Sequence, residues 1–138
     1  MTRPEQLAEA CRRYGLLAVY LFGSRKDDGK RLLQGDRVEA AGSDLDVGVV
    51  FDPPPPDYRR LGAVQIAIED AIEPLRVDLV PLNKVDPLFQ FAAIDGHRVA
   101  VLDAHRADLF ELYVMRRAAE MLPLQRQFEI ERFGVSNR

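Results

Sequence analysis

Hydrophobic and polar positions alternate along this chain with two different periods, and these periods predict helices and strands in turn. Apolar and small residues recur three and four apart from Pro4 to Tyr14, where Gly15 supplies a stop, so this segment is predicted to be a helix. The next run, LLAVYLF at 16–22, is rich in β-forming residues and predicts a central strand. The polar, glycine-broken stretch from Arg25 to Gly42 predicts a loop that is helical in part.

The second half of the chain repeats this alternation. In chain order, the pattern predicts a strand over 43–52 (SDLDVGVVFD) that PPPP at 53–56 ends, a helix capped by Asp57 and running to Pro74, a strand over 76–82 (RVDLVPL), a short helix over 87–94, a strand over 97–103 (HRVAVLD) and a long helix over 107–122. No internal repeat is visible. Helices and strands that alternate in this way predict an α/β (α+β) fold.

A chain of 138 residues is long enough to bury one core and too short for two ordinary ones. We therefore expect a single domain over 1–138, in which helices flank a mixed central sheet of about four strands. Within it, residues 26–42 form an inserted loop and residues 107–122 the C-terminal helix.

Composition excludes several classes of protein. No apolar run approaches the roughly 20 residues that cross a bilayer, and the first fifteen residues lack the apolar core of a secretory signal, so we expect a cytoplasmic protein. A net charge of −3 argues against broad nucleic-acid binding. Cys11 is the only cysteine and is predicted to be a buried helix residue. Two histidines are too few for a zinc site built from His and Cys, so oxygen atoms would bind any metal.

Three aspartates are the candidate catalytic and metal-binding residues. In a strand, Asp44 and Asp46 point to the same face with Cα atoms roughly 6.6 Å apart, while Leu45 and Val47 point to the other face. Two such carboxylates repel each other unless a cation lies between them. Asp78 sits in another apolar strand, where an unpaired charge is costly. Structural alternatives remain open, in which Asp44 is a turn residue and Asp78 pairs with Arg76 on an exposed face.

A Gly-Ser pair follows the first strand. Gly23 can take a positive φ and bring the backbone close to a ligand, and Ser24 can cap the following helix while it offers a hydroxyl. A helix N-terminus attracts anions, so this turn is a candidate site for the outer phosphates of a nucleotide. The basic residues just after it, Arg25, Lys26 and Lys30, either meet a triphosphate or form a solvated basic loop.

Together, Gly23-Ser24 after VYLF, then SDLDVGVVF, then RVDLVPLN resemble the DNA polymerase β-type nucleotidyltransferases, in particular the minimal nucleotidyltransferases of prokaryotes. The resemblance implies a mixed sheet, two Mg²⁺ ions and transfer of a nucleoside monophosphate, AMP from ATP being the expected case, to a hydroxyl. It implies that Asp44 and Asp46 bind both metals. It also implies that Asp78 binds the catalytic metal and that Gly23 and Ser24 hold the β- and γ-phosphates.

The spacing departs from the family pattern. Nineteen residues separate Ser24 from Asp44, more than is usual in the minimal enzymes. We interpret the excess, around DDGKRLLQGDRVEAA, as an inserted flap or a longer hairpin, because surface insertions cost little. The acids within it, Asp27, Asp28 and Asp36, are not expected to bind metal.

The acceptor is the open question. The chain lacks room for domains that bind tRNA, poly(A) ends or aminoglycosides, and the resemblance implies an antitoxin whose partner is a helical HEPN-family ribonuclease. Neutralisation would occur by binding, by AMP transfer to a tyrosine, or by both. The alternatives are an inactive toxin-binding module and transfer to a small molecule or an RNA end. The sequence does not predict which nucleotide base is preferred or whether the chain forms homo-oligomers. Apolar residues of the final helix either contact a partner or cover the sheet: Leu109, Leu112, Tyr113, Met115, Met121 and Leu122.

Overall fold

The structure, a computed structural model, describes the backbone of residues 1–133 and the side chains of residues 1–122. The elements in chain order are α1 (Arg3–Tyr14), β1 (Leu16–Phe22), α2 (Lys26–Leu33), β2 (Leu45–Phe51), α3 (Leu61–Ile72), β3 (Val77–Pro81), the 3₁₀ helix η1 (Leu82–Lys84), α4 (Pro87–Ile94), β4 (His97–Val101) and α5 (Ala104–Phe133). The predicted single-domain α/β fold is confirmed. The last five residues of the predicted domain, 134–138, lie outside the described residues.

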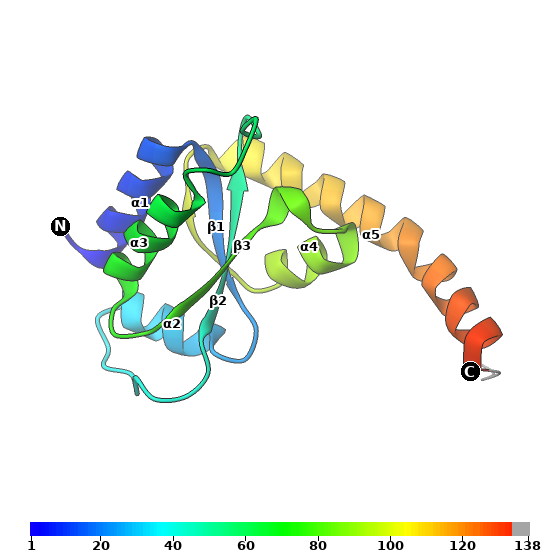
Figure 1. Ribbon diagram of the computed structural model, residues 1–138, viewed down its shortest axis with the longest axis horizontal. Coiled ribbons are helices and arrows are strands. Elements are labelled where there is room, and N and C mark those ends of the chain that lie inside the picture. The colour runs from blue at the N-terminus through cyan, green and yellow to red at the C-terminus, as the bar shows by residue number, and fades with distance from the viewer. Residues whose placement is uncertain (134–138) are drawn as a thin grey trace.

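The sheet has four strands in the order β3-β2-β1-β4 (Figure 1). Strand β1 pairs antiparallel with both β2 and β4, whereas β2 and β3 run parallel and are joined through α3. The sheet is therefore mixed, as predicted. Because β2 and β3 are parallel, the residues at their beginnings lie side by side at one end of the sheet.

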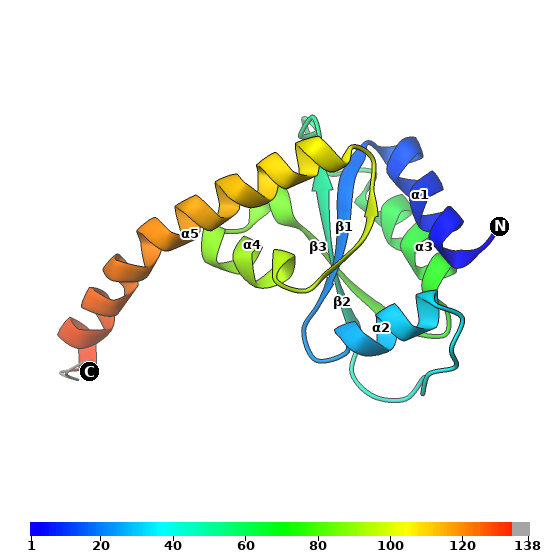
Figure 2. The ribbon, with the colours of Figure 1, turned by 180° about the vertical axis from the view of Figure 1, so that it is seen from behind.

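Two hydrophobic layers enclose the sheet, with α1, α2 and α3 on one face and α4 and α5 on the other (Figures 1 and 2). Alternation along β2 assigns its residues to these layers: Leu45, Val47 and Val49 belong to the first core, and Val50 belongs to the second. Asp46 lies on the same side of β2 as Val50, because successive side chains alternate between faces.

Several element boundaries differ from the prediction. Helix α2 occupies the first half of the segment expected to be an inserted loop, so the irregular part of the insertion is confined to the residues between α2 and β2. The prediction that Asp57 caps α3 was wrong. The helix begins at Leu61, and the Asp57 carboxylate instead accepts hydrogen bonds from the backbone and side chain of Arg59. Such local Asx bonding competes with helix capping.

The single cysteine lies inside the first core. Cys11 is 1% exposed, on the face of α1 that packs against the sheet, as predicted. Burial raises the pKa of its thiol to about 11. The thiol is therefore neutral and enclosed at physiological pH.

A polar network fastens α5 to the centre of the sheet. The buried Tyr20 hydroxyl donates a hydrogen bond of 2.7 Å to Glu111 Oε2, and Arg98 Nη1 donates to the same oxygen at 2.8 Å. Arg98 also binds Asp108 at 2.8 Å. Burial and the Glu111 carboxylate raise the pKa of Tyr20 well above its usual range.

Replacement of Tyr20 by Phe is expected to lower the free energy of unfolding by about 1–3 kcal/mol, because it removes a buried hydrogen bond to a charged group. Tyr113→Phe is the matched control, since that hydroxyl is exposed and, among residues 1–122, accepts a hydrogen bond from Arg117 alone. Urea denaturation of both variants measures the difference. Equal losses in the two variants would contradict a stabilising role of the Tyr20 bond.

Helix α5 is longer than predicted and extends beyond the sheet (Figures 1 and 2). Its inward face is made by the small or apolar residues Ala107, Phe110, Val114 and Ala118. The predicted stripe does not cover the sheet, because most of its members are exposed: Leu109, Leu112, Tyr113, Met115 and Leu122. Among residues 1–133, no helix is both long and apolar enough to span a membrane.

Candidate functional site

The acids predicted from sequence lie at the beginnings of β2 and β3. Asp46 and Asp78 are direct partners in the parallel ladder, so their side chains lie next to each other on the same face of the sheet. Asp44 is exposed and precedes β2 by one residue. Alternation along the sequence predicted that Asp44 and Asp46 share a face, and the parallel pairing brings Asp78 beside Asp46.

The electrostatics of Asp46 reflect this crowding. Burial raises its pKa, and the neighbouring charges of Asp78 and Asp44 and a hydrogen bond with Asp78 raise it further. Within the described side chains, none of these three aspartates forms a salt bridge with a basic residue, so the alternative pairing of Asp78 with Arg76 is not found. The site therefore carries negative charge that no described basic side chain compensates.

The carboxylates do not form a closed metal cage by themselves. In the described part of the chain, no three Asp, Glu, His or Cys side chains are gathered tightly enough to be recognised as a metal site. Asp46 and Asp78 face each other as ladder partners, whereas Asp44 affects Asp46 through its charge. The arrangement nevertheless suits a hard divalent cation, because carboxylate oxygens are its preferred ligands and mutual repulsion disfavours the empty cluster.

Gly23 brings the turn after β1 against the carboxylate of Asp46. Its φ is +75°, and a Cβ atom added to it would lie 2.1 Å from Asp46 Oδ2. Only glycine satisfies both the left-handed backbone and this close approach. The Gly23 turn and the acidic residues therefore lie next to each other and form one site.

Ser24 lies at the same turn, but the prediction that its side chain caps the next helix was wrong. The N-cap residue of α2 is Arg25, which makes no side-chain capping bond. The exposed Ser24 hydroxyl instead lies 3.4 Å from that of Ser43, the residue before Asp44. Ser24 therefore connects the turn to the start of the acidic segment.

Among the basic residues after the turn, Arg25 does not extend toward a ligand. Its side chain is buried, and the guanidinium donates hydrogen bonds to carbonyl oxygens between α2 and β2. A triphosphate-binding role for Arg25, one of the two alternatives, therefore does not fit. Sequence reasoning missed this role because an arginine beside a polar loop gives no signal of the direction in which it points.

The other acids near the turn, which were predicted not to bind metal, form contacts with basic side chains. Asp27 Oδ1 lies 2.7 Å from His97 Nε2, and this hydrogen bond lowers the pKa of Asp27. Asp28 pairs with Arg25 and Asp36 with Arg31. These contacts hold α2 to β4 and to the following loop.

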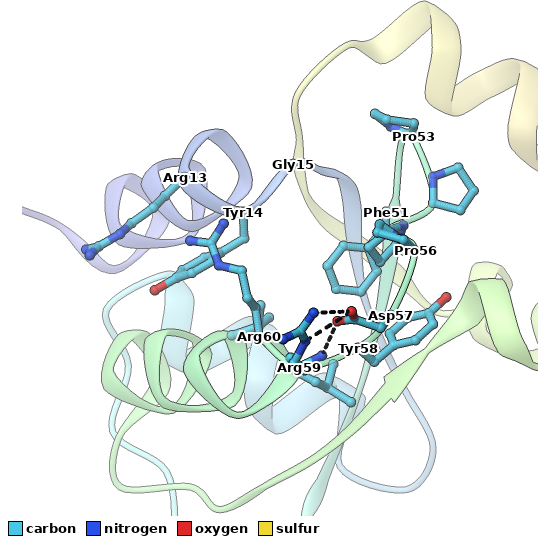
Figure 3. A pocket seen from close by; sticks show the side chains of 14 residues that line it. Arg13, Tyr14, Gly15, Phe51, Pro53, Pro56, Asp57, Tyr58, Arg59 and Arg60 are labelled. Atoms are coloured by element: carbon cyan, nitrogen blue, oxygen red, sulfur yellow. Dashed lines mark hydrogen bonds and ion pairs between the residues drawn. The ribbon is translucent and has the colours of Figure 1, made fainter.

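A cavity of about 730 Å³ lies at the opposite end of β2, beside Phe51 (Figure 3). Tyr14, Tyr58 and the four prolines 53–56 form much of its wall. Among the described residues that line it, Asp57 alone has a carboxylate, and this carboxylate is bound to Arg59. Phe51 lies five residues from Asp46, roughly 16 Å along a strand, so this cavity is separate from the acidic site.

Comparison with known proteins assigns this arrangement to a family. The family model described as Polymerase beta, Nucleotidyltransferase matches residues 5–104, which include the turn, the three acids and all four strands. The chain belongs to the polymerase beta nucleotidyltransferase family. No match is found among curated proteins.

Solved structures similar to this nucleotidyltransferase come from toxin–antitoxin complexes. A double aspartate-to-glutamate mutant of the toxin–antitoxin MntA–HpeT has a TM-score of 0.67 at 17% identity, covering 96% of this chain and 98% of that chain. A toxin–antitoxin with AMP-PNP has a TM-score of 0.64 at 19% identity, with coverage of 96% and 98%. A tri-AMPylated Shewanella oneidensis HEPN toxin in complex with MNT antitoxin has a TM-score of 0.63 at 17% identity, with coverage of 96% and 97%. At these identities the likeness establishes the shared fold.

Proposed function

We propose that this nucleotidyltransferase transfers AMP from ATP, with Mg²⁺, to a hydroxyl of a partner protein, and that the partner is a HEPN-type ribonuclease toxin. The observation that carries the proposal is the contact of the Gly23 turn with Asp46, which is itself paired with Asp78. A nucleotide's phosphates and an acceptor hydroxyl must meet at such a junction of a phosphate-binding turn and clustered carboxylates.

In this proposal Asp44, Asp46 and Asp78 hold the metal. Two Mg²⁺ ions bound there would neutralise phosphate charge and align the attacking and leaving oxygens. The protein's own contribution is positioning. Gly23 lets the backbone approach the β- and γ-phosphates, the Ser24 hydroxyl binds a phosphate oxygen, and Asp78 orients the acceptor hydroxyl from the adjacent strand.

The partner assignment rests on the related complexes and on α5. Structures with the same fold contain an AMP-PNP-bound toxin–antitoxin and an AMPylated HEPN toxin held by its MNT antitoxin. In this chain, α5 presents exposed apolar side chains that the sheet does not use, among them Leu109, Leu112 and Tyr113. Exposed clusters of this kind are typical of protein contact surfaces.

The decisive experiment mixes the purified chain with a HEPN-type protein encoded beside it, Mg²⁺ and ATP labelled at the α-phosphate. Label is expected on the partner protein, and Asp46→Asn is expected to abolish it. A small-molecule or RNA acceptor would be indicated if label appeared in those fractions instead. Absence of label from every acceptor, with Asp46→Asn behaving identically, would refute the activity.

A second candidate function, neutralisation by binding alone, is favoured by the exposed face of α5. It predicts that the double variant Asp44→Asn/Asp46→Asn still neutralises the toxin in cells. The catalytic proposal predicts that this variant loses neutralisation while it still binds. Growth assays combined with co-purification separate the two functions.

The α5 contact face gives a prediction of its own. Leu112→Asp is expected to weaken partner binding at least about 10-fold, because it places a charge at the centre of an apolar contact. Its effect on stability should be small, since Leu112 is 49% exposed. Isothermal titration calorimetry of partner binding and thermal melting of the free chain measure the two effects.

Ile66→Asp is the matched control. Ile66 is 62% exposed but lies on α3, on the other face of the sheet, and should leave partner binding unchanged. If both variants bound the partner like the wild type, α5 would not be the contact face.

A further inference from the structure

The segment between α2 and β2 has few internal anchors. Residues 34–44 are nearly all exposed, and Val38 alone packs against the hydrophobic core. Two of its glycines have positive φ, so the chain turns sharply at both ends. Apolar burial is therefore too small to fix the path of this segment.

Arg25 supplies the missing anchor. Its guanidinium donates to the carbonyl oxygens of Glu39, Ala41 (3.4 Å) and Ser43 (3.1 Å), and its Nε donates to Asp28 at 3.2 Å. Arg25 is 8% exposed. A buried guanidinium needs several acceptors, and the segment provides them by wrapping around it.

These bonds end next to the acidic site. Ser43 is followed by Asp44, which precedes β2 and so lacks the ladder pairing that fixes Asp46 to Asp78. The backbone on the C-terminal side of Asp44 is already fixed, because the Leu45 N–H donates to the Arg76 carbonyl oxygen at 2.8 Å. On its N-terminal side, the position of Asp44 depends on the Ser43 backbone that Arg25 holds. The Ser24 hydroxyl, 3.4 Å from that of Ser43, supports the same point from the phosphate turn.

We propose that Arg25 is a positioning residue that, through the inserted segment, holds Asp44 in place to bind the divalent cation with Asp46 and Asp78. The insertion thereby becomes part of the scaffold of the site instead of a flap over it. This inference rests on the proposed function, because it assumes that Asp44 is a metal ligand. Groups that orient metal ligands typically contribute 10–100-fold to metal affinity.

The test measures Mn²⁺ binding to the full chain by electron paramagnetic resonance and Mg²⁺-dependent AMP-PNP binding by calorimetry. Arg25→Ala is expected to raise the Mn²⁺ Kd by about 10–100-fold, measured where thermal melting shows the variant to be folded. Arg25→Lys keeps the buried charge but loses the planar fork, so an intermediate increase is expected and the variant serves if Arg25→Ala does not fold. Arg12→Ala, at an exposed arginine of α1 that pairs with Glu9 of the same helix, should bind like the wild type.

The outcomes separate the two proposals. Failure of the wild-type chain to bind Mn²⁺ or AMP-PNP would overturn the proposed function and this inference with it. Wild-type binding with an unchanged Mn²⁺ Kd in folded Arg25→Ala and Arg25→Lys would overturn the positioning role alone. Loss of stability without any change in metal affinity would likewise show that Arg25 only holds the loop.

Discussion

Asp46→Asn is expected to reduce nucleotidyl transfer by more than about 100-fold while it stabilises the metal-free protein. In the proposed function, the activity falls because the amide replaces a charged carboxylate that would bind the metal. Stability rises because burial and the charges of Asp78 and Asp44 disfavour the ionised Asp46 carboxylate in the absence of a cation. Labelled-ATP assays and thermal melting in EDTA measure the two effects.

The difference in stability between the metal-free wild type and Asp46→Asn depends on pH. Because burial and the neighbouring acids raise the pKa of Asp46, the folded state favours its protonated form. That stabilising contribution is present below the carboxyl's usual pKa of about 4 and is lost as pH rises through the folded-state value. The metal-free wild type should therefore lose stability relative to Asp46→Asn as the pH is raised from about 4 toward neutrality.

Magnesium should make the wild type more stable than Asp46→Asn, the reverse of their order without metal. Saturating Mg²⁺ is expected to raise the melting temperature of the wild type and to have little effect on Asp46→Asn, because a ligand stabilises only the state that binds it. Asp70→Asn, an exposed change on α3, controls for loss of a surface charge. The interpretation of Asp46 as a repelled, metal-binding carboxylate would be rejected if Asp46→Asn destabilised the metal-free protein.

Gly23→Ala is expected to reduce transfer by a similar factor for a different reason. The new Cβ would lie 2.1 Å from Asp46 Oδ2, so the carboxylate must rotate away from its place beside Asp78. The loss of stability should be modest, about 1–2 kcal/mol for alanine at positive φ, because the displaced atom ends a flexible side chain. Transfer kinetics and urea denaturation of the same preparation separate the two losses.

Gly15→Ala provides a control matched in backbone conformation. Gly15 has a φ of +69°, and a Cβ placed there would meet no atom within 4 Å. Gly15→Ala should lose about as much free energy of unfolding as Gly23→Ala, because both place alanine at positive φ. Its transfer activity should stay close to that of the wild type. Equal loss of transfer in both variants would mean that Gly23 is needed only for its backbone conformation.

Much of the fold followed from periodicity, because the strands are short apolar runs bounded by glycine and proline. The face shared by Asp44 and Asp46 followed from alternation along one strand. The pairing of Asp46 with Asp78 required more, since it depends on two strands distant in sequence running parallel in one register. Before the fold was known, the sequence indicated only that a neighbouring strand could bring Asp78 to that face, and the family resemblance connected the three acids.

The errors came from local rules that other contacts overrode, tertiary contacts for Ser24 and Arg25 and a contact within the turn for Asp57. Capping rules assume that a helix starts just after a suitable side chain, but the turn at Gly23 directs Ser24 toward Ser43. Asp57 satisfied its oxygens within its own turn by bonding Arg59. The direction of Arg25 was not predictable from sequence, because whether a long basic side chain extends or folds inward depends on acceptors supplied 14 to 18 residues away.

The enclosed thiol of Cys11 has a practical consequence for testing the partner surface. A buried, protonated thiol reacts slowly with maleimides and other thiol reagents, and the sequence contains no second cysteine. A cysteine introduced at Leu112 would thus be the single site of labelling without removal of the native residue. A fluorophore or spin label attached there would report directly when a partner covers α5.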